Sequence, residues 1–169
     1  MGKESVEIIK KLLNVEELIK MLNEALSEEW LAYYQYWVGA KLVEGPLRPS
    51  VEEELIVHAN EELGHAEMLI DRIIELEGTP VLSPEDWFKL ARCKYYPPTD
   101  PYIVSILNDN LKGERCAIIR YQELADYTFG KDHKTYKIVT QILEDELEHE
   151  QEIEDWLKDI KDIKTHTVK

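Results

Sequence analysis

The sequence predicts an all-α protein in which four long helices form one bundle, with a long connection in the middle. Two observations carry this prediction. Apolar residues recur every three or four positions along four long segments, and glycine and proline are scarce, at seven each in 169 residues, which disfavours a turn-rich β fold. A hydrophobic fraction of 44% excludes a disordered chain. The length suits a single domain, residues 1–169, with a substantial core.

The first bundle helix is predicted over residues 14–44, after a short amphipathic segment at 1–13. Asn14 is the expected N-cap, with Glu17 three residues later as in a capping box. Gly45 and the proline after it end the helix.

The second and third bundle helices are predicted over residues 51–77 and 101–129. Ser50 is the expected N-cap of the second helix. Asp100 is the expected N-cap of the third, followed by Pro101 at the first helical position, where proline is favoured.

The fourth helix is predicted over residues 132–163, and the connection at 78–100 sets the topology. A 25-residue helix spans about 38 Å, a distance that a dozen extended residues cover, so this connection can return along the bundle and still form a short helix within 83–92. Two helical hairpins joined by one long crossover is the arrangement of ferritin-like bundles. Only about twenty residues follow His149, so no fifth helix is expected.

The charge of the chain bears on its partners. The formal net charge of −15 opposes binding to nucleic acid and suits a protein that handles cations. No apolar run approaches the roughly 18–20 residues of a membrane span, and the N-terminal residues lack the apolar stretch of a secretory signal. A cytoplasmic protein without a membrane partner is therefore expected.

Six polar side chains interrupt the apolar stripes where the periodicity places the core: Glu29, Glu62, His65, Glu114, Glu146 and His149. An unpaired buried carboxylate is strongly disfavoured, so four carboxylates and two imidazoles at one level predict a pair of metal ions between the helices. One Glu from each of two helices, with Glu-x-x-His from the other two, is the pattern of di-iron and di-manganese carboxylate proteins.

The spacing of these residues supports a common level in the bundle. Glu62 follows Glu29 by 33 positions and Glu146 follows Glu114 by 32, so the two halves of the chain repeat one pattern. The alternative is a helical bundle with charged surface stripes. No role is assigned to the remaining histidines, His58, His133 and His166.

With these residues in place, the chain resembles the bacterioferritins along all four helices, roughly residues 14–160. The segments that carry the likeness are EWLAYYQYW, which contains Glu29, ELGHAEMLIDRIIELEGTP, and the ligand positions of the last two helices. The resemblance implies bridging of two irons by Glu62 and Glu146, completion of one iron site by Glu29 and His65, and completion of the other by Glu114 and His149.

Residues beside the ligands are expected to orient them. The resemblance implies that Glu61 and Asp145 hydrogen-bond the ligand histidines. Tyr36 and Tyr121 each lie seven residues after a ligand glutamate, on the same helix face, and are interpreted as hydrogen-bond donors to the ligands or as ordinary core tyrosines. Leu63 stands where the bacterioferritins carry their haem-ligating methionine, so no haem is expected.

The missing fifth helix, the short crossover helix and two cysteines resemble the Dps-like ferritins, also called thioferritins. The segments concerned are ARCKYYPP around Cys93 and GERCAIIRYQELADYTFGKDHKTY around Cys116. From the residues alone, the cysteines are two small apolar side chains, and Cys116, two residues past Glu114, points away from the metals. The resemblance makes Cys93 and Cys116 a candidate redox pair, with the disulfide left open.

The thioferritin resemblance implies a hollow dodecamer that oxidises Fe(II), preferentially with hydrogen peroxide rather than oxygen, and stores Fe(III). Manganese in place of iron is not distinguished by the residues. One alternative is a rubrerythrin-like peroxidase or a dimanganese catalase that stores nothing, although the chain has no rubredoxin-type Cys-x-x-Cys pair. A DNA-binding protective protein is a further alternative, which the net charge opposes.

Overall fold

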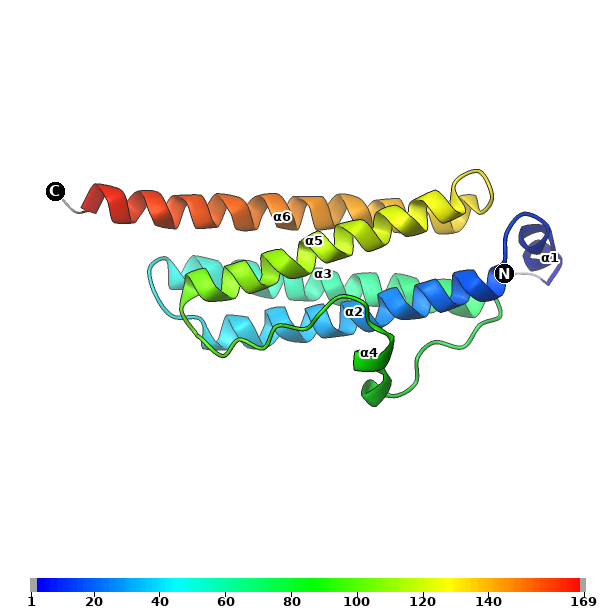
Figure 1. Cartoon of the computed structure of the whole chain (residues 1–169), viewed down its shortest axis with the longest axis horizontal. Helices are drawn as coiled ribbons and strands as arrows, with labels where there is room; N and C mark the ends of the chain where they lie inside the picture. Colours follow the sequence, from blue (N-terminus) through cyan, green and yellow to red (C-terminus); the bar gives the residue numbers. More distant parts are fainter. Residues whose placement is uncertain (1–2, 168–169) are drawn as a thin grey trace.

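The structure is a computed structural model that describes residues 3–167, and within that range it contains six helices and no strand (Figure 1). The helices are α1 (Lys3–Lys10), α2 (Val15–Leu42), α3 (Arg48–Glu75), α4 (Pro84–Leu90), α5 (Ile103–Thr128) and α6 (His133–Thr167). The predicted all-α bundle with a crossover between its second and third long helices is confirmed. The ends of the predicted domain, residues 1–2 and 168–169, lie outside the described residues.

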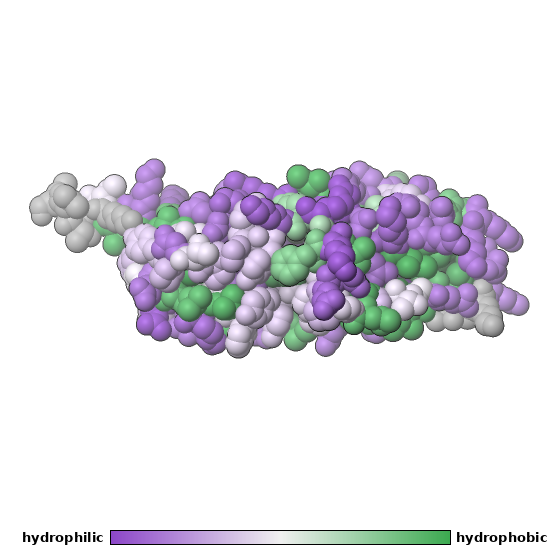
Figure 2. All heavy atoms as spheres, turned by 60° about the horizontal axis from the view of Figure 1, so that its bottom comes forward, coloured by the Kyte–Doolittle hydropathy of each residue, from purple (hydrophilic) through white to green (hydrophobic). Residues whose placement is uncertain are grey.

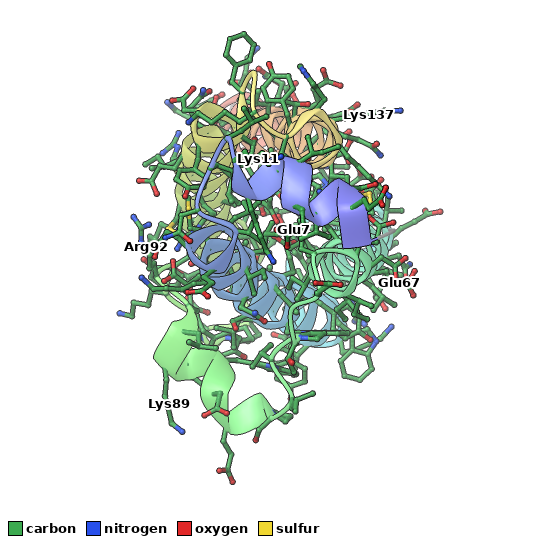
Figure 3. The ribbon with its side chains drawn as sticks, turned by 90° about the vertical axis from the view of Figure 1, so that its right-hand side faces the viewer. Glu7, Lys11, Glu67, Lys89, Arg92 and Lys137 are labelled. Atoms are coloured by element: carbon green, nitrogen blue, oxygen red, sulfur yellow. A yellow bond between two sulfur atoms is a disulfide. The ribbon has the colours of Figure 1, made fainter. Side chains whose placement is uncertain are left out.

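The bundle consists of two hairpins. Helix α2 packs along α3, and α5 packs along α6, while α2–α5 and α3–α6 contacts join the hairpins. The crossover runs back along α2, and the short helix α4 packs on the outer side of α2 with Lys89 directed away from the bundle (Figures 1 and 3). Helix α1 lies across one end of the bundle, as the end-on view shows (Figure 3).

Three helices begin at a residue whose side chain caps them, and Asn14 is the one of these caps that is predicted above. The Asn14 side chain accepts hydrogen bonds from the backbone N–H groups of residues 16 and 17. Ser83 accepts one from Glu85 at the start of α4, and Asp132 accepts one from Thr135 at the start of α6. These oxygens satisfy N–H groups that have no partner within the helix.

The second bundle helix starts earlier than predicted, at Arg48, and Ser50 does not cap it. The N-cap is Leu47, whose backbone is left-handed at φ 61° and whose side chain makes no capping hydrogen bond. The Leu47 carbonyl instead accepts hydrogen bonds from the N–H groups of Ser50 and Val51. Ser50 therefore lies inside the first turn, where Pro49 is tolerated because its nitrogen needs no partner.

The third bundle helix starts later than predicted, at Ile103, and Asp100 does not cap it. Asp100 accepts a hydrogen bond from the N–H of Tyr102, which closes a local turn. Residues 101–103 are then held extended by pairing with Glu44, whose N–H donates to Pro101 and whose carbonyl accepts from Ile103. This pairing joins the end of α2 to the start of α5, and α2 ends at Leu42 rather than at the predicted residue 44. Helix α6 continues to Thr167 rather than ending at the predicted residue 163.

The apolar core consists of two clusters, one toward each end of the bundle. The first contains Leu18, Leu22, Leu69, Leu124 and Ile142 among others. The second contains Val51, Leu55, Ile103, Leu107 and Ile153 among others. The predicted polar residues fall between these two clusters along every long helix.

The turn after α3 contains a left-handed residue that is not glycine. Glu77 has φ 66°, and its N–H bonds to the Ile74 carbonyl while that of Gly78 bonds to Ile73, the pattern of a Schellman motif. Gly78 is needed for another reason, because a Cβ there would lie 2.8 Å from a methyl carbon of Ile19.

Glu77→Gly is therefore expected to raise the free energy of unfolding by about 1 kcal/mol, since a left-handed backbone is unfavourable for an L-residue. Gly78→Ala is expected to lower it by about 1–3 kcal/mol through overpacking. Urea unfolding at fixed chain concentration measures both changes. A destabilised Glu77→Gly variant would contradict the assignment of strain to this residue.

None of the helices in the described part of the chain is long and apolar enough to cross a membrane. The face shown in Figure 2 carries mostly hydrophilic residues with separate hydrophobic patches. The most exposed of the large apolar side chains include Leu82, Phe88 and Phe129.

Candidate metal centre

The six predicted ligand residues meet in the middle of the bundle. Glu29 comes from α2, Glu114 from α5, and the two Glu-x-x-His pairs from α3 and α6. All six are at most 3% exposed. The side chains form two groups that share Glu62 and Glu146: one is completed by Glu29 and His65, the other by Glu114 and His149. Within each group the ligand atoms lie within 4.8 Å of one another.

The two histidines are oriented alike, with Nδ1 toward the carboxylates and Nε2 toward a partner near the surface. His65 Nδ1 lies 3.1–3.4 Å from oxygens of Glu62, Glu146 and Glu29, whereas Nε2 lies 3.1 Å from Asp145. A carboxylate at Nε2 fixes the orientation of the ring, and it would hold the proton on Nε2 when Nδ1 gives its lone pair to a metal ion.

His149 repeats this arrangement on the other side. Its Nδ1 lies 3.6–3.8 Å from oxygens of Glu62, Glu114 and Glu146. Its Nε2 lies 2.9 Å from Glu61. The structure thus places Glu61 and Asp145 against the histidines as the sequence analysis expects.

Two buried tyrosines contact the terminal glutamates across the bundle. The Tyr36 hydroxyl of α2 donates to Glu114 of α5, and the Tyr121 hydroxyl of α5 donates to Glu29 of α2. Both rings are at most 1% exposed. Each tyrosine therefore orients the carboxylate of the opposite helix and leaves that glutamate's second oxygen free.

The carboxylates crowd one another strongly. Burial and then repulsion by Glu62 raise the pKa of Glu29 well above its ordinary value, and burial and then Glu146 do the same to the pKa of Glu114. Burial also acts to raise the pKa of Glu62, but the His149 and His65 imidazoles lower it below its usual range. Four negative charges do not coexist here without protons or cations.

The donor set fits divalent cations. Several buried atoms have no hydrogen-bond partner: Glu29 Oε2, Glu62 Oε1, Glu114 Oε2, Glu146 Oε1 and His149 Nδ1. An orphaned buried oxygen is expensive unless a cation satisfies it. Carboxylate oxygens with imidazole nitrogens are ligands of first-row transition metals, and Fe(II) and Mn(II) both suit them.

The metal-free protein is expected to lose stability as pH rises from 5 to 8. Because the folded-state pKa values of Glu29 and Glu114 are raised, their contribution is present below the unfolded value of about 4.3 and is lost as pH rises toward the folded value. The slope is about 1.4 kcal/mol per pH unit for each extra proton that the folded state holds.

Urea unfolding of chelator-treated protein at several pH values measures this loss. Glu29→Gln/Glu114→Gln is the matched variant, and its stability should depend less on pH. Parallel pH profiles for the two proteins would contradict the crowding argument.

A small cavity connects the carboxylates with the crossover. It has a volume of about 40 Å³ and is lined by the four glutamates of the centre together with residues of the crossover, including Cys93, Lys94 and Tyr95. A volume of this size holds a few water-sized molecules. The cavity therefore has room for a small molecule beside the carboxylates.

Glu28, which the sequence analysis did not single out, fixes the crossover beside this cavity. Its carboxylate accepts hydrogen bonds from the N–H groups of Arg92 and Cys93. Both its oxygens also pair with the buried Arg120 guanidinium of α5 at 3.0 and 3.2 Å. Further along, Gln35 accepts from the N–H of Tyr96 and donates to Asn110.

The cysteines are joined in the structure. Cys93 of the crossover and Cys116 of α5 form a disulfide, with their Cα atoms 5.7 Å apart. The bond ties the crossover to α5, as the outward direction of Cys116 from the metal face allows.

His58, to which no role was assigned, lies directly against the centre. It is 1% exposed, and its ring stacks on His149 with centroids 4.1 Å apart. Burial and then His149 lower the pKa of His58 to about 4. A lone histidine carries no spacing signal, so sequence reasoning had nothing by which to find it.

This fold and this centre are those of a ferritin-like protein, and comparison with known proteins agrees. Residues 19–163 match the ferritin-like domain family, and the chain belongs to that family. The chain is similar to a dodecameric thioferritin, the bacterioferritin-related protein of Bacteroides fragilis, with 56% identity and a TM-score of 0.98 over 99% of this chain and 100% of that one. The thioferritin resemblance is thereby confirmed.

Two curated relatives are also similar to this chain in sequence. A DNA protection during starvation protein of Pyrococcus furiosus is 37% identical over 147 residues, 86% of this chain and 79% of the relative. A bacterioferritin of Rhodobacter capsulatus is 33% identical over 111 residues, 66% of this chain and 63% of the relative.

Proposed function

We propose that the chain is a ferroxidase and iron-storage protein, which binds two Fe(II) ions at the candidate centre, oxidises them and retains Fe(III) in a hollow shell. The observation that carries the proposal is the pair of ligand groups that share Glu62 and Glu146. The orphaned oxygens of those groups support it, because they have no other partner to satisfy them.

The proposed reaction is a two-electron step. Two Fe(II) ions each give up one electron, and one hydrogen peroxide with two protons becomes two water molecules. Two ions suit this step because neither has to lose a second electron. The chain's own part is to hold both ions between Glu62 and Glu146 and to keep His65 and His149 in one tautomer. Hydrogen peroxide is the proposed oxidant, with oxygen as the alternative.

The proposed assembly is a shell of twelve chains with a mass of about 240 kDa, given 19.8 kDa per chain. The relative from B. fragilis is a dodecamer. Exposed apolar side chains such as Leu82 and Phe88 support an assembly, since large apolar patches are otherwise left in water.

The Cys93–Cys116 pair is proposed as a redox-active disulfide beside the route to the centre. Both the bond and the position of Cys93 in the cavity lining support this proposal. Thiol titration of aerobically purified protein should find no free thiol before reduction and two per chain afterwards. Two free thiols before reduction would overturn it.

DNA protection is named for the P. furiosus relative, but we do not propose it for this chain. A net charge of −15 repels a phosphate backbone, and counterion release gives an acidic surface no compensating gain.

The function is tested by loading metal-free protein with two Fe(II) per chain in the absence of oxygen. One equivalent of hydrogen peroxide or of oxygen per chain is then added. The proposal expects rapid Fe(III) formation at two Fe(II) per peroxide, and iron that co-elutes with a shell of about 240 kDa after many additions. A dimer that consumes peroxide repeatedly without retaining iron would instead indicate a rubrerythrin-like peroxidase or dimanganese catalase.

A further inference from the structure

A second cluster of metal-binding side chains lies next to the centre, between α3 and α6. Glu54, His58 and Glu152 place one ligand atom each within 4.8 Å of one another. His58 Nε2 lies 2.8 Å from a Glu152 oxygen and 3.6 Å from a Glu54 oxygen. Glu54 precedes His58 by one helical turn, and Glu152 follows His149 by three residues, so both helices direct these groups to the same side.

The cluster has no cation of its own among the described residues. His58 is the only ion-pair partner found there for either Glu54 or Glu152. His58 Nδ1 is buried without a hydrogen-bond partner, so the two carboxylates meet the imidazole only at Nε2. Burial and the Glu152 charge raise the pKa of Glu54, as expected for two carboxylates that lack a compensating charge.

The surroundings are open and acidic. Two surface hollows meet at Glu54 and Glu152, and neither is lined by a lysine or an arginine in the part of the chain that the structure describes. One hollow, of about 110 Å³, reaches Glu61 and Asp145, which hold the outer nitrogens of the ligand histidines. A cation at the cluster would therefore lie beside the centre and within reach of solvent.

We propose that Glu54, His58 and Glu152 form a third site, which binds one divalent transition-metal cation exchangeably beside the two-metal centre. The imidazole nitrogen selects transition metals over Mg²⁺ and Ca²⁺, which prefer oxygen ligands. Binding is weaker than at the centre for two reasons: the two carboxylates are 33% and 39% exposed, and Nδ1 lacks the acceptor that normally supports a ligand histidine.

The test counts ions by equilibrium dialysis of the assembled, metal-free protein against Co(II), without oxygen and with excess Mg²⁺ to suppress unspecific binding to acidic groups. Wild-type protein should bind three Co(II) per chain, and Glu54→Gln/Glu152→Gln should bind two. Both substitutions are at partly exposed positions, so the variant should fold. The matched control is Glu53→Gln/Glu144→Gln, which removes the same charge from exposed positions of the same helices and should still bind three.

Anomalous diffraction from a crystal soaked in Co(II) locates the ions. A peak at His58 Nε2, in addition to two at the centre, supports the third site. Two peaks at the centre alone, or equal stoichiometry in wild type and Glu54→Gln/Glu152→Gln, overturn it and leave the proposed function standing. A peak at His58 without peaks at the centre would support this site while contradicting the two-metal centre.

Discussion

Glu146→Gln is expected to slow peroxide-dependent Fe(II) oxidation by at least about 100-fold while leaving the shell assembled. Glu146 belongs to both ligand groups, so its neutralisation weakens both proposed iron sites at once. Removing one preorganised group that stabilises the charge developing in a reaction, such as one oxyanion-hole donor, costs about 100- to 1000-fold in rate. The variant should still fold, because glutamine matches the volume of glutamate and one of four crowded carboxylates is removed.

The rate is measured by single-turnover stopped flow with two Fe(II) per chain, together with the elution volume of the shell. Glu144→Gln is the matched control: it lies on the same helix two residues away, and its side chain is exposed. It should oxidise iron at the wild-type rate. A Glu146→Gln variant within about threefold of wild type would contradict the bridging position proposed for this residue.

The centre could be predicted from the sequence because its signal is periodic. Glu29 and Glu114 each interrupt an apolar stripe, and Glu-x-x-His recurs at nearly the same distance in each half of the chain. Helix geometry then brings residues that are 33 and 32 positions apart to one level. In the structure these side chains meet as two groups with shared members, which is the arrangement that the periodicity indicates.

What the sequence did not reveal depends on contacts between distant segments. Glu28 precedes Glu29 and looks like one more acidic surface residue, yet the crossover and Arg120 bury it. Ser50 is a good capping residue, but the left-handed Leu47 starts the helix earlier. Asp100 is also a good capping residue, but α5 does not start there because Glu44 pairs with the residues at the start of α5. In each case a tertiary contact overrides a local preference.

Arg120→Leu is expected to lower the free energy of unfolding by about 3–5 kcal/mol, because it leaves the Glu28 carboxylate buried without a cation. Arg120 is 2% exposed and lies within 3.2 Å of both Glu28 and Glu24. The Arg92 and Cys93 N–H groups would still bond to Glu28, but two neutral donors do not replace a guanidinium. The crossover should loosen where it covers the cavity beside the centre.

Arg115→Leu is the matched control, since Arg115 lies on the same helix and pairs with Glu150 and Glu154, but is 54% exposed. The Arg115→Leu substitution should lower the free energy of unfolding by about 0–1 kcal/mol. Urea unfolding at equal chain concentration compares the two variants, and Glu28→Leu/Arg120→Leu should recover a large part of the loss because no charge remains buried. If Arg120→Leu were no less stable than Arg115→Leu, the Glu28–Arg120 pair would not be what holds the crossover to the bundle, and the disulfide between Cys93 and Cys116 would have to carry that role.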